Sequence, residues 1–433
     1  MSEQRQRILI TSGRVIDPAS GFDQQASIAI ADGKVVAIGN AADDFQADRT
    51  IDAAGCVVAP GLVDLAARLR EPGHEHERML DSEMAAAVAG GVTSLVCPPD
   101  TDPVLDEPGL VEMLTFRAKR QRGARLYPLG ALTRGLAGEV LTEMVELTEA
   151  GCIGFSQAEV PLASTQVLYR ALQYASTFGY TVWLRPQDRD LGNGVAASGP
   201  LATRLGLAGV PVAAETIALF TIFELMKSTG ARVHLCRLSS ADGVQLVRDA
   251  KAAGLPVTCD VSINSLHLID TDIGYFDSSA RLTPPLRQQR DRDALSAGLA
   301  DGTIDALVSD HTPIDSDAKT LPFAEAEAGA TGLELLLPLA LRWGERSGAG
   351  LARALDVITA APAKLLRAEA RAGRLGEGSV ADICVFDPAV EWQVTAESLR
   401  SQGKHTPFAG YALRGRARFT LVGGRVVHEQ PVE

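Results

Sequence analysis

The feature that most constrains the fold is an alternation of short apolar runs with helical segments between residues 57 and 309. Eight runs read as buried strands, and amphipathic stretches such as 165–179 and 241–254 separate most of them. Parallel strands covered on both faces are almost continuously apolar, so eight of them alternating with helices favour a (β/α)8 barrel. A doubly wound sheet is the structural alternative. The runs cover residues 57–65, 92–97, 124–132, 152–156, 180–184, 231–238, 256–261 and 304–309.

The two ends of the chain resemble each other and differ from the middle. Each carries short β-branched runs, broken at Asp32-Gly33 near the start and at Gly423-Gly424 near the end. Such dipeptides between apolar runs are typical of β-hairpins. We therefore expect a small β-sandwich domain built from both termini, residues 1–60 and 376–433, around a barrel of residues 61–375.

Charge and cysteine content narrow the classes of partner and compartment. With 41 Lys and Arg against 54 Asp and Glu, the net charge of -13 argues against nucleic acid and anionic membranes as partners. The six cysteines are scattered without a CxxC pair, as expected for buried reduced thiols. The first residues lack the apolar region of a signal peptide, and no run approaches the roughly 20 residues of a membrane span. We expect a cytoplasmic protein.

In such a barrel the carboxyl ends of the strands form the functional face. A zinc site there would need several imidazoles, thiolates or carboxylates. The chain offers chiefly Asp310 and His311, together with arginines, which stay protonated and cannot coordinate a cation. The residues that follow the strands are Ala66, Arg68, Asp100, Gln157, Arg185, Arg237, Asn264, Asp310 and His311.

Several motifs resemble those of dihydroorotases, members of the amidohydrolase superfamily. They run in the family's order from residue 61 to residue 388, which is a specific match. The resemblance implies an amidohydrolase-type (β/α)8 barrel with a small β domain from both termini, in agreement with the pattern above. The motifs are GLVDLAARLREPG, GCIGFSQAEVP, LTPPLR, ALVSDHTP and GRLGEGSVADICVFDP.

The chain departs from the family at the positions that the resemblance assigns to metal ligands. Of the ligands, only Asp310, the family's metal ligand and general base, remains. The flanking residues match on both sides, so misalignment does not explain the losses. We therefore expect no metal and no cofactor, and Asp310 would be vestigial because no metal activates a water for it. The replaced ligand positions are Ala66, Arg68, Gln157, Arg185 and Arg237.

The substrate pocket implied by the resemblance is altered as well. Arg70, which would hold the substrate carboxylate, is present, and His311 follows Asp310 as in the family; both would be vestigial. Asp100 and Thr283 each occupy a position at which the family has an asparagine. A carboxylate at position 100 would repel an anionic substrate, and one interpretation pairs it with Arg70.

The arginines suggest how the scaffold survives without metal. Buried charges must be paired, so Arg68, Arg185 and Arg237 could pair with Asp310 in place of metal ions. The alternative is that some of them reach solvent through the barrel mouth. We interpret the other histidines as structural or exposed: His74 and His76 as loop residues rather than a displaced metal site, His234 and His267 as hydrogen-bonded in the barrel.

These features favour a catalytically inactive dihydroorotase homologue. The resemblance implies a specific partner, because some bacteria pair an inactive dihydroorotase-like chain with the aspartate transcarbamoylase catalytic chain in a hetero-dodecamer. A homodimer is also possible for this family. The alternatives are an active amidohydrolase with a non-standard site and a sensor that binds an anion at the arginine-rich mouth.

Overall fold

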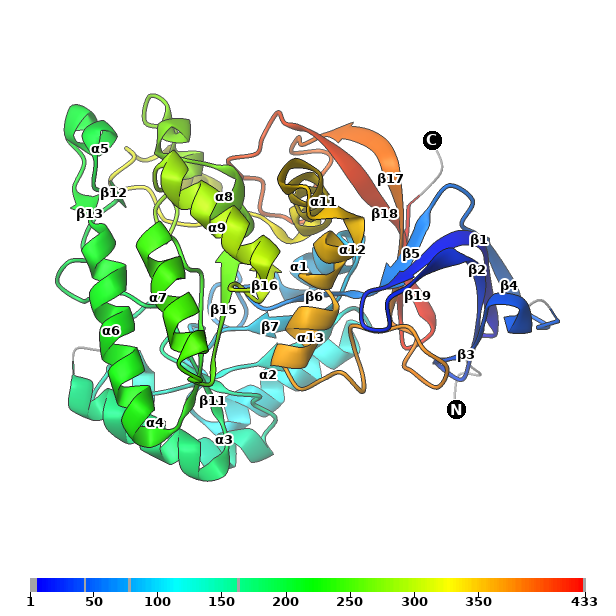
Figure 1. Ribbon diagram of the computed structural model, residues 1–433, viewed down its shortest axis with the longest axis horizontal. Helices are drawn as coiled ribbons and strands as arrows, with labels where there is room; N and C mark the ends of the chain where they lie inside the picture. Colours follow the sequence, from blue (N-terminus) through cyan, green and yellow to red (C-terminus); the bar gives the residue numbers. More distant parts are fainter. Residues whose placement is uncertain (1–5, 43, 77–78, 162–163, 431–433) are drawn as a thin grey trace.

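The computed structural model describes residues 6–42, 44–76, 79–161 and 164–430. It has a (β/α)8 barrel with a small β domain at one side (Figure 1). The small domain contains one eight-stranded sheet, in which β5 of the N-terminal segment pairs with β17 of the C-terminal segment. Its strands are β1 (Ile8–Asp17), β2 (Phe22–Ala31), β3 (Lys34–Ile38), β4 (Arg49–Asp52), β5 (Val57–Pro60), β17 (Ile383–Gln393), β18 (Ala412–Val422) and β19 (Arg425–Glu429).

The hairpins predicted at the two dipeptides are confirmed. Asp32 and Gly33 have φ values of 52° and 77° and join β2 to β3, while Gly423 and Gly424, at 55° and 72°, join β18 to β19. Positive φ at both turn residues matches the twist of the paired strands, which is why these dipeptides occur there. The sheet has a core of its own, formed by residues such as Ile10, Val58 and Ile383.

The barrel strands are parallel and short. A parallel bridge between Ala67 and His311 joins the ends of the first and eighth strands and closes the barrel. The third strand is interrupted and contributes two pieces, β8 and β9. The strands are β6 (Leu62–Asp64), β7 (Val92–Cys97), β8 (Arg125–Pro128), β9 (Gly130–Ala131), β10 (Phe155–Ser156), β11 (Thr181–Leu184), β14 (Arg232–Leu235), β15 (Val257–Ser262) and β16 (Ala306–Val308).

The first expected strand, residues 57–65, differs in the structure, because it is divided between the two sheets. Val57–Pro60 belongs to the small domain and Leu62–Asp64 to the barrel. Gly61 lies at the division, where a Cβ atom would meet the side chain of Thr93 at 2.2 Å. Only glycine allows this close approach, and the chain passes there from the sheet of the small domain into the barrel.

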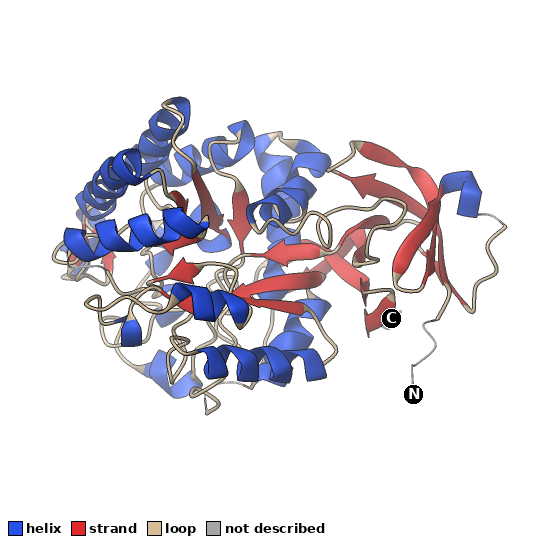
Figure 2. Ribbon diagram, turned by 90° about the horizontal axis from the view of Figure 1, so that it is seen from below, coloured by secondary structure: helices blue, strands red, loops and turns tan. Residues whose placement is uncertain are grey.

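The helices surround the barrel (Figures 1 and 2). α4 illustrates their local design: the Ser164 side chain accepts a hydrogen bond from the Val167 amide at 3.3 Å, and Gly179 ends the helix with φ of 71°. The helices are α1 (Leu80–Ala89), α2 (Pro108–Arg120), α3 (Met144–Glu149), α4 (Thr165–Phe178), α5 (Pro200–Leu205), α6 (Val212–Thr229), α7 (Ala241–Ala252), α8 (Ile263–His267), α9 (Gln289–Asp301), α10 (Ser316–Thr320), α11 (Leu336–Ser347), α12 (Gly350–Asp356) and α13 (Ala360–Leu365).

The cysteines and the helix lengths can be compared with what the composition led us to expect. All six cysteines are free thiols, and five of them are buried. Among the helices that the structure describes, none combines the length and the apolar character needed to cross a membrane.

Candidate functional site

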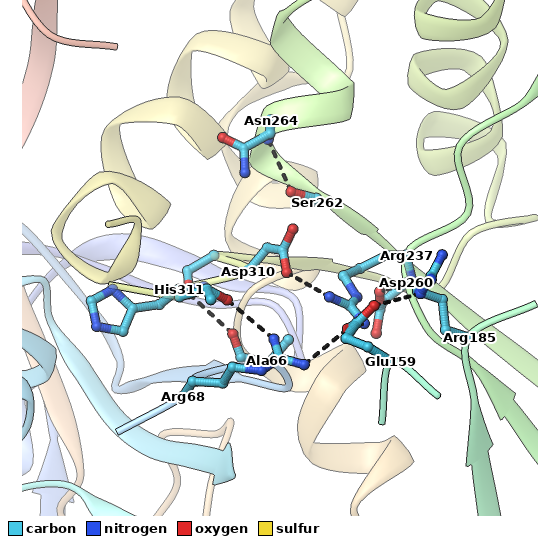
Figure 3. Close-up of polar contacts among 12 residues, drawn as sticks. Ala66, Arg68, Glu159, Arg185, Arg237, Asp260, Ser262, Asn264, Asp310 and His311 are labelled. Atoms are coloured by element: carbon cyan, nitrogen blue, oxygen red, sulfur yellow. Dashed lines mark hydrogen bonds and ion pairs between the residues drawn. The ribbon is translucent and has the colours of Figure 1, made fainter. Parts of the chain in front are cut away.

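The charged residues that the sequence placed at the strand ends converge at the barrel mouth. Arg68 follows β6, Arg185 follows β11, Arg237 follows β14 and Asp310 follows β16. Figure 3 shows these side chains pointing toward one another. These residues meet although they are far apart in the sequence, because parallel strands bring their carboxyl ends to one face.

Glu159 occupies the middle of this group. Its Oε1 accepts a hydrogen bond from Arg68 Nη2 at 2.8 Å and contacts Arg237 Nη2, while its Oε2 lies 2.5 Å from Arg185 Nε. One carboxylate thus binds three guanidinium groups that come from three different strands (Figure 3). Sequence reasoning did not select Glu159, although it lies within the quoted motif around Gln157.

The other two carboxylates of the cluster each bind one arginine. Arg237 Nη1 donates to Asp310 Oδ1 at 3.0 Å, and Arg68 Nε donates to Asp100 Oδ2 at 2.8 Å. The hypothesis that all three arginines pair with Asp310 is therefore wrong for Arg68 and Arg185, because Arg68 binds Asp100 and Glu159 and Arg185 binds Glu159.

Asp100 was interpreted as a partner of Arg70, and this is also wrong. Asp100 binds Arg68, whereas Arg70 Nε donates to the carbonyl of Pro313 at 2.8 Å and Arg70 Nη2 lies 3.4 Å from Glu327 Oε1. Arg70 has a φ of 61°, and these two contacts lie on the segment after β16. Arg70 still lines the mouth cavity.

The pKa shifts of the two central carboxylates point in opposite directions. Burial alone would raise the pKa of Glu159, but Arg237, Arg185 and Arg68 together hold that pKa well below its usual range. For Asp310 burial prevails, and its pKa is raised in spite of Arg237 and Arg68. Arg237 therefore pairs more strongly with Glu159 than with Asp310.

The cluster balances its own charge. Arg68, Arg185 and Arg237 contribute three positive charges, and Asp100, Glu159 and Asp310 contribute three negative charges. Their pairing compensates the cost of burying them. The same positions in the family hold metal, and the residues here do not fit one: guanidinium groups have no lone pair to donate, and the carboxylates are already bound to them.

Backbone strain is concentrated at the same place. In the described ranges ten non-glycine residues have a positive φ, and four of them belong to the mouth: Arg70, Ala158, Arg237 and Asp310. Such conformations are unfavourable for residues with a Cβ and gather at functional sites. The strand ends have this strained backbone although the side chains provide no metal site.

Gln157 and His311 turn away from the cluster. The Gln157 amide is buried, accepts a hydrogen bond from Thr133 Oγ1 at 2.9 Å and donates one to the Leu136 carbonyl at 2.7 Å. The His311 ring is also buried, and its Nδ1 accepts a hydrogen bond from the Gly332 amide at 3.1 Å. His311 Nε2 therefore carries the proton and donates to Glu83 at 2.8 Å.

Glu83 is a buried carboxylate that sequence reasoning did not select. It lies on α1 and also accepts a hydrogen bond from Ser401 Oγ at 2.6 Å. Burial would raise its pKa, but the hydrogen bonds that it accepts from His311, Ser401 and Ser82 lower it. Glu83 thereby connects α1, the end of β16 and the C-terminal segment, and it gives His311 a structural role.

Within the described ranges, one group of side chains next to the cluster has the composition of a metal site. The ligand atoms of His234, Cys236 and Asp260 all lie within 4.8 Å of one another. His234 Nε2 already binds Asp260 Oδ2 at 2.9 Å, and Asp260 Oδ1 accepts a hydrogen bond from the backbone amide of Arg237 at 2.7 Å. Burial raises the pKa of the Cys236 thiol well above its usual value, so the thiolate that a metal requires is disfavoured.

The remaining candidates have structural surroundings. His234 and His267 are hydrogen-bonded, as predicted; His267 Nε2 contacts the Leu339 carbonyl at 2.9 Å, and burial lowers the His267 pKa to about 3. His74 and His76 lie in the loop before α1, as predicted. Asn264 is buried beside Ser262. The Ser262 Oγ accepts a hydrogen bond from the backbone amide of Asn264 at 3.1 Å (Figure 3).

The cluster forms the floor of a cavity of 530 Å³ at the barrel mouth. Five arginines and four carboxylates line it, together with backbone of the loops around residues 192–194 and 327–330. Arg281 is the member without a carboxylate partner among the described residues, and its Nε is buried without a hydrogen bond. Thr283, at the family's asparagine position, is also part of the lining.

Comparison with known proteins places this architecture in a family. A family model described as Dihydro-orotase-like matches residues 55–243, and one described as Amidohydrolase family matches residues 210–427. A dihydroorotase-like protein of Pseudomonas aeruginosa is 47% identical over 98% of this chain and 99% of its own length. The chain belongs to the dihydroorotase-like amidohydrolases.

Other relatives extend the comparison. A dihydroorotase of a Geobacter species is 40% identical over 98% of this chain and 99% of its own length. Among solved structures, the L-hydantoinase of Arthrobacter aurescens superposes with a TM-score of 0.86 at 27% identity, covering 98% of this chain and 96% of its own. This dihydroorotase-like chain thus shares the fold of cyclic-amide hydrolases over its full length, with an arginine–carboxylate cluster at its mouth.

Proposed function

We propose that this chain is a catalytically inactive dihydroorotase homologue in pyrimidine biosynthesis. The observation that carries the proposal is the Glu159 cluster, in which three guanidinium groups stand at the strand ends where a metal would be held. Amide hydrolysis in this superfamily relies on a metal to activate water and polarise the carbonyl. Asp310, bound to Arg237, has no such water to deprotonate.

We further propose that the chain acts as a structural and assembly partner of the aspartate transcarbamoylase catalytic chain. The support is the family resemblance, since inactive dihydroorotase-like chains of some bacteria form a hetero-dodecamer with that enzyme. An intact scaffold around a site without catalytic groups fits this role, because an interface uses the surface of the fold and needs no catalytic groups. Homodimerisation would be compatible with such an assembly.

Co-expression tests the partner directly. We expect this chain and the aspartate transcarbamoylase catalytic chain to copurify as a particle with the mass of six copies of each. Transcarbamoylase activity should be at least tenfold higher with this chain than without it, because the partner would need the assembly. Native mass measurement and an activity assay of each preparation give the result. Independent migration of the two chains, with unchanged activity, would refute the partnership.

Metal content and hydrolase activity test the inactivity. After incubation with zinc and desalting, we expect far less than one metal ion per chain and no dihydroorotase rate above background. Loss of a catalytic metal removes several kcal/mol of barrier reduction, and each 1.36 kcal/mol is tenfold in rate. The Geobacter relative, named a dihydroorotase, is a suitable positive control. A robust rate with stoichiometric zinc would instead support an active amidohydrolase with a non-standard site.

An anion-binding sensor is the second candidate, favoured by the unpaired Arg281 in the mouth cavity. Five arginines against four carboxylates leave the lining with one excess positive charge. A rise in melting temperature with millimolar phosphate or a small dicarboxylate, abolished in Arg281→Ala, would favour this function over a purely structural one.

A further inference from the structure

An aromatic pair projects from the segment between α8 and α9. The Tyr275 side chain is 91% exposed, the largest value among the exposed large hydrophobic residues that the structure describes, where the next value is 61%. Phe276 beside it is 36% exposed, and the two rings meet edge to face with centroids 5.3 Å apart. Aromatic side chains are costly to leave in water and dominate the energetics of interfaces, so this pair calls for a functional reason.

Buried side chains and hydrogen bonds hold the base of this segment. Ile273 is buried, and its carbonyl accepts the Asp277 amide at 2.9 Å. The buried Lys319 of α10 donates from Nζ to the carbonyls of Ser278 and Arg281 at 3.0 and 3.1 Å. A tip presented on a fixed base loses little conformational freedom on binding, which favours affinity.

The backbone of the tip is strained in order to present the rings. Gly274 and Phe276 have φ values of 56° and 63°. Glycine adopts this conformation readily, but for a bulky aromatic residue it is an outlier. A second glycine at position 276 would make the same turn without strain, so Phe276 adopts this φ at a cost in backbone energy.

The charge around the tip selects the kind of surface that it can meet. Asp270, Asp272 and Asp277 flank the aromatic pair, while Arg281 faces the mouth cavity and Lys319 is buried at the base. Three carboxylates oppose contact with nucleic acid or an anionic membrane. They fit an apolar protein pocket with a basic rim, because complementary charges steer association and fix its register.

We propose that the tip Gly274–Asp277 is an anchor that inserts into an apolar, basic-rimmed pocket of the partner protein. The inference rests on the proposed function, which makes that partner the aspartate transcarbamoylase catalytic chain. Tyr275 and Phe276 fill the pocket, and the three aspartates pair with lysines or arginines at its rim.

The test measures binding of purified full-length chains by titration calorimetry. Replacing both rings, Tyr275→Ala with Phe276→Ala, should weaken the Kd at least tenfold, as expected for a central aromatic anchor. Phe276→Gly should also weaken binding and yet unfold at a temperature close to that of the unchanged protein, since glycine relieves the positive φ. Phe116→Ala is the matched control: it removes a 61% exposed ring from α2 and should leave the Kd within twofold. Asp270→Asn with Asp272→Asn should reduce the salt dependence of binding.

The outcomes separate this inference from the proposed function. If the unchanged chains bind and the tip variants bind equally well, the tip is not the anchor although the partnership holds. If the unchanged chains do not bind, both proposals fail. Loss of a homodimer in light scattering of the tip variants, with partner binding retained, would assign the tip to a second copy and overturn the proposal. Flotation with anionic lipid vesicles that depends on Tyr275 would also overturn it.

Discussion

Glu159→Gln is expected to lower the free energy of unfolding by about 3 kcal/mol at pH 7. The substitution keeps the volume of the side chain but removes the charge that binds Arg68, Arg185 and Arg237, all nearly buried. Removing one partner from a buried ion pair costs more than the pair itself contributes, because the remaining charges lose their compensation. The Glu159 side chain keeps 30% of its surface open to the mouth cavity, which places the loss at the lower end of the usual range.

The loss should depend on pH in a defined direction. The folded-state pKa of Glu159 lies below the value of about 4.3 that is expected in the unfolded chain. Its pairing therefore contributes full stability above the unfolded pKa, and this contribution disappears as the pH falls toward the folded pKa. The difference between the unchanged protein and Glu159→Gln should shrink below about pH 4. Urea titrations at a series of pH values measure it.

Glu391→Gln provides the matched control. Glu391 forms an exposed ion pair with Arg414 in the small domain, and its loss should cost less than about 0.5 kcal/mol. Equal, small effects of the two substitutions would mean that water in the mouth cavity solvates the three arginines and that the cluster does not support the fold.

The barrel was predictable from the sequence because its physical signal is local. A strand covered on both faces is apolar at successive positions, as in β7, where all six residues are buried. The same signal could not divide residues 57–65 between two sheets. Val57–Pro60 and Leu62–Asp64 are both fully buried, although they belong to different sheets, and the division depends on the approach of Gly61 to Thr93, which is distant in sequence.

The positions of the charges at the mouth were also predictable, but their partners were not. Strand order brings Arg185, Arg237 and Asp310 to one face whatever their side chains do. The pairing of carboxylates with arginines depends on backbone turns. One such turn is at Ala158, which has a φ of 49° and directly precedes Glu159. A count of charge would have found Glu159: three arginines at buried strand ends need more than Asp310, and Glu159 is the nearest unassigned acid after β10.

Arg237→Met is expected to destabilise the protein by a similar amount, about 3 kcal/mol at pH 7, for a different reason. Arg237 bridges two carboxylates. When Arg237 is replaced, Glu159 still binds Arg68 and Arg185. Asp310 loses its only ion-pair partner among the described residues and remains buried. The destabilisation should therefore come mainly from an unpaired carboxylate rather than from unpaired arginines.

The pH dependence distinguishes the two variants. The pKa of Asp310 is already raised by burial, and without Arg237 it should rise further. A carboxylate whose folded pKa exceeds its unfolded value of about 3.9 costs stability above that value, and the cost vanishes as the pH falls and the folded group takes up a proton. The deficit of Arg237→Met should accordingly narrow already as the pH falls from 7 toward 5, while that of Glu159→Gln persists there.

A second substitution isolates the charge of Asp310. In the double variant Arg237→Met with Asp310→Asn, stability should recover by at least about 1.5 kcal/mol relative to Arg237→Met alone, because no buried charge is left unpaired. Asp310→Asn alone should cost less than Arg237→Met, since Arg237 still binds Glu159. If the deficit of Arg237→Met were constant between pH 5 and 8 and unchanged by Asp310→Asn, lost packing of the long side chain, not pairing of charge, would be what Arg237 contributes. The arginines would then fill the space at the strand ends without compensating the negative charge of the carboxylates there.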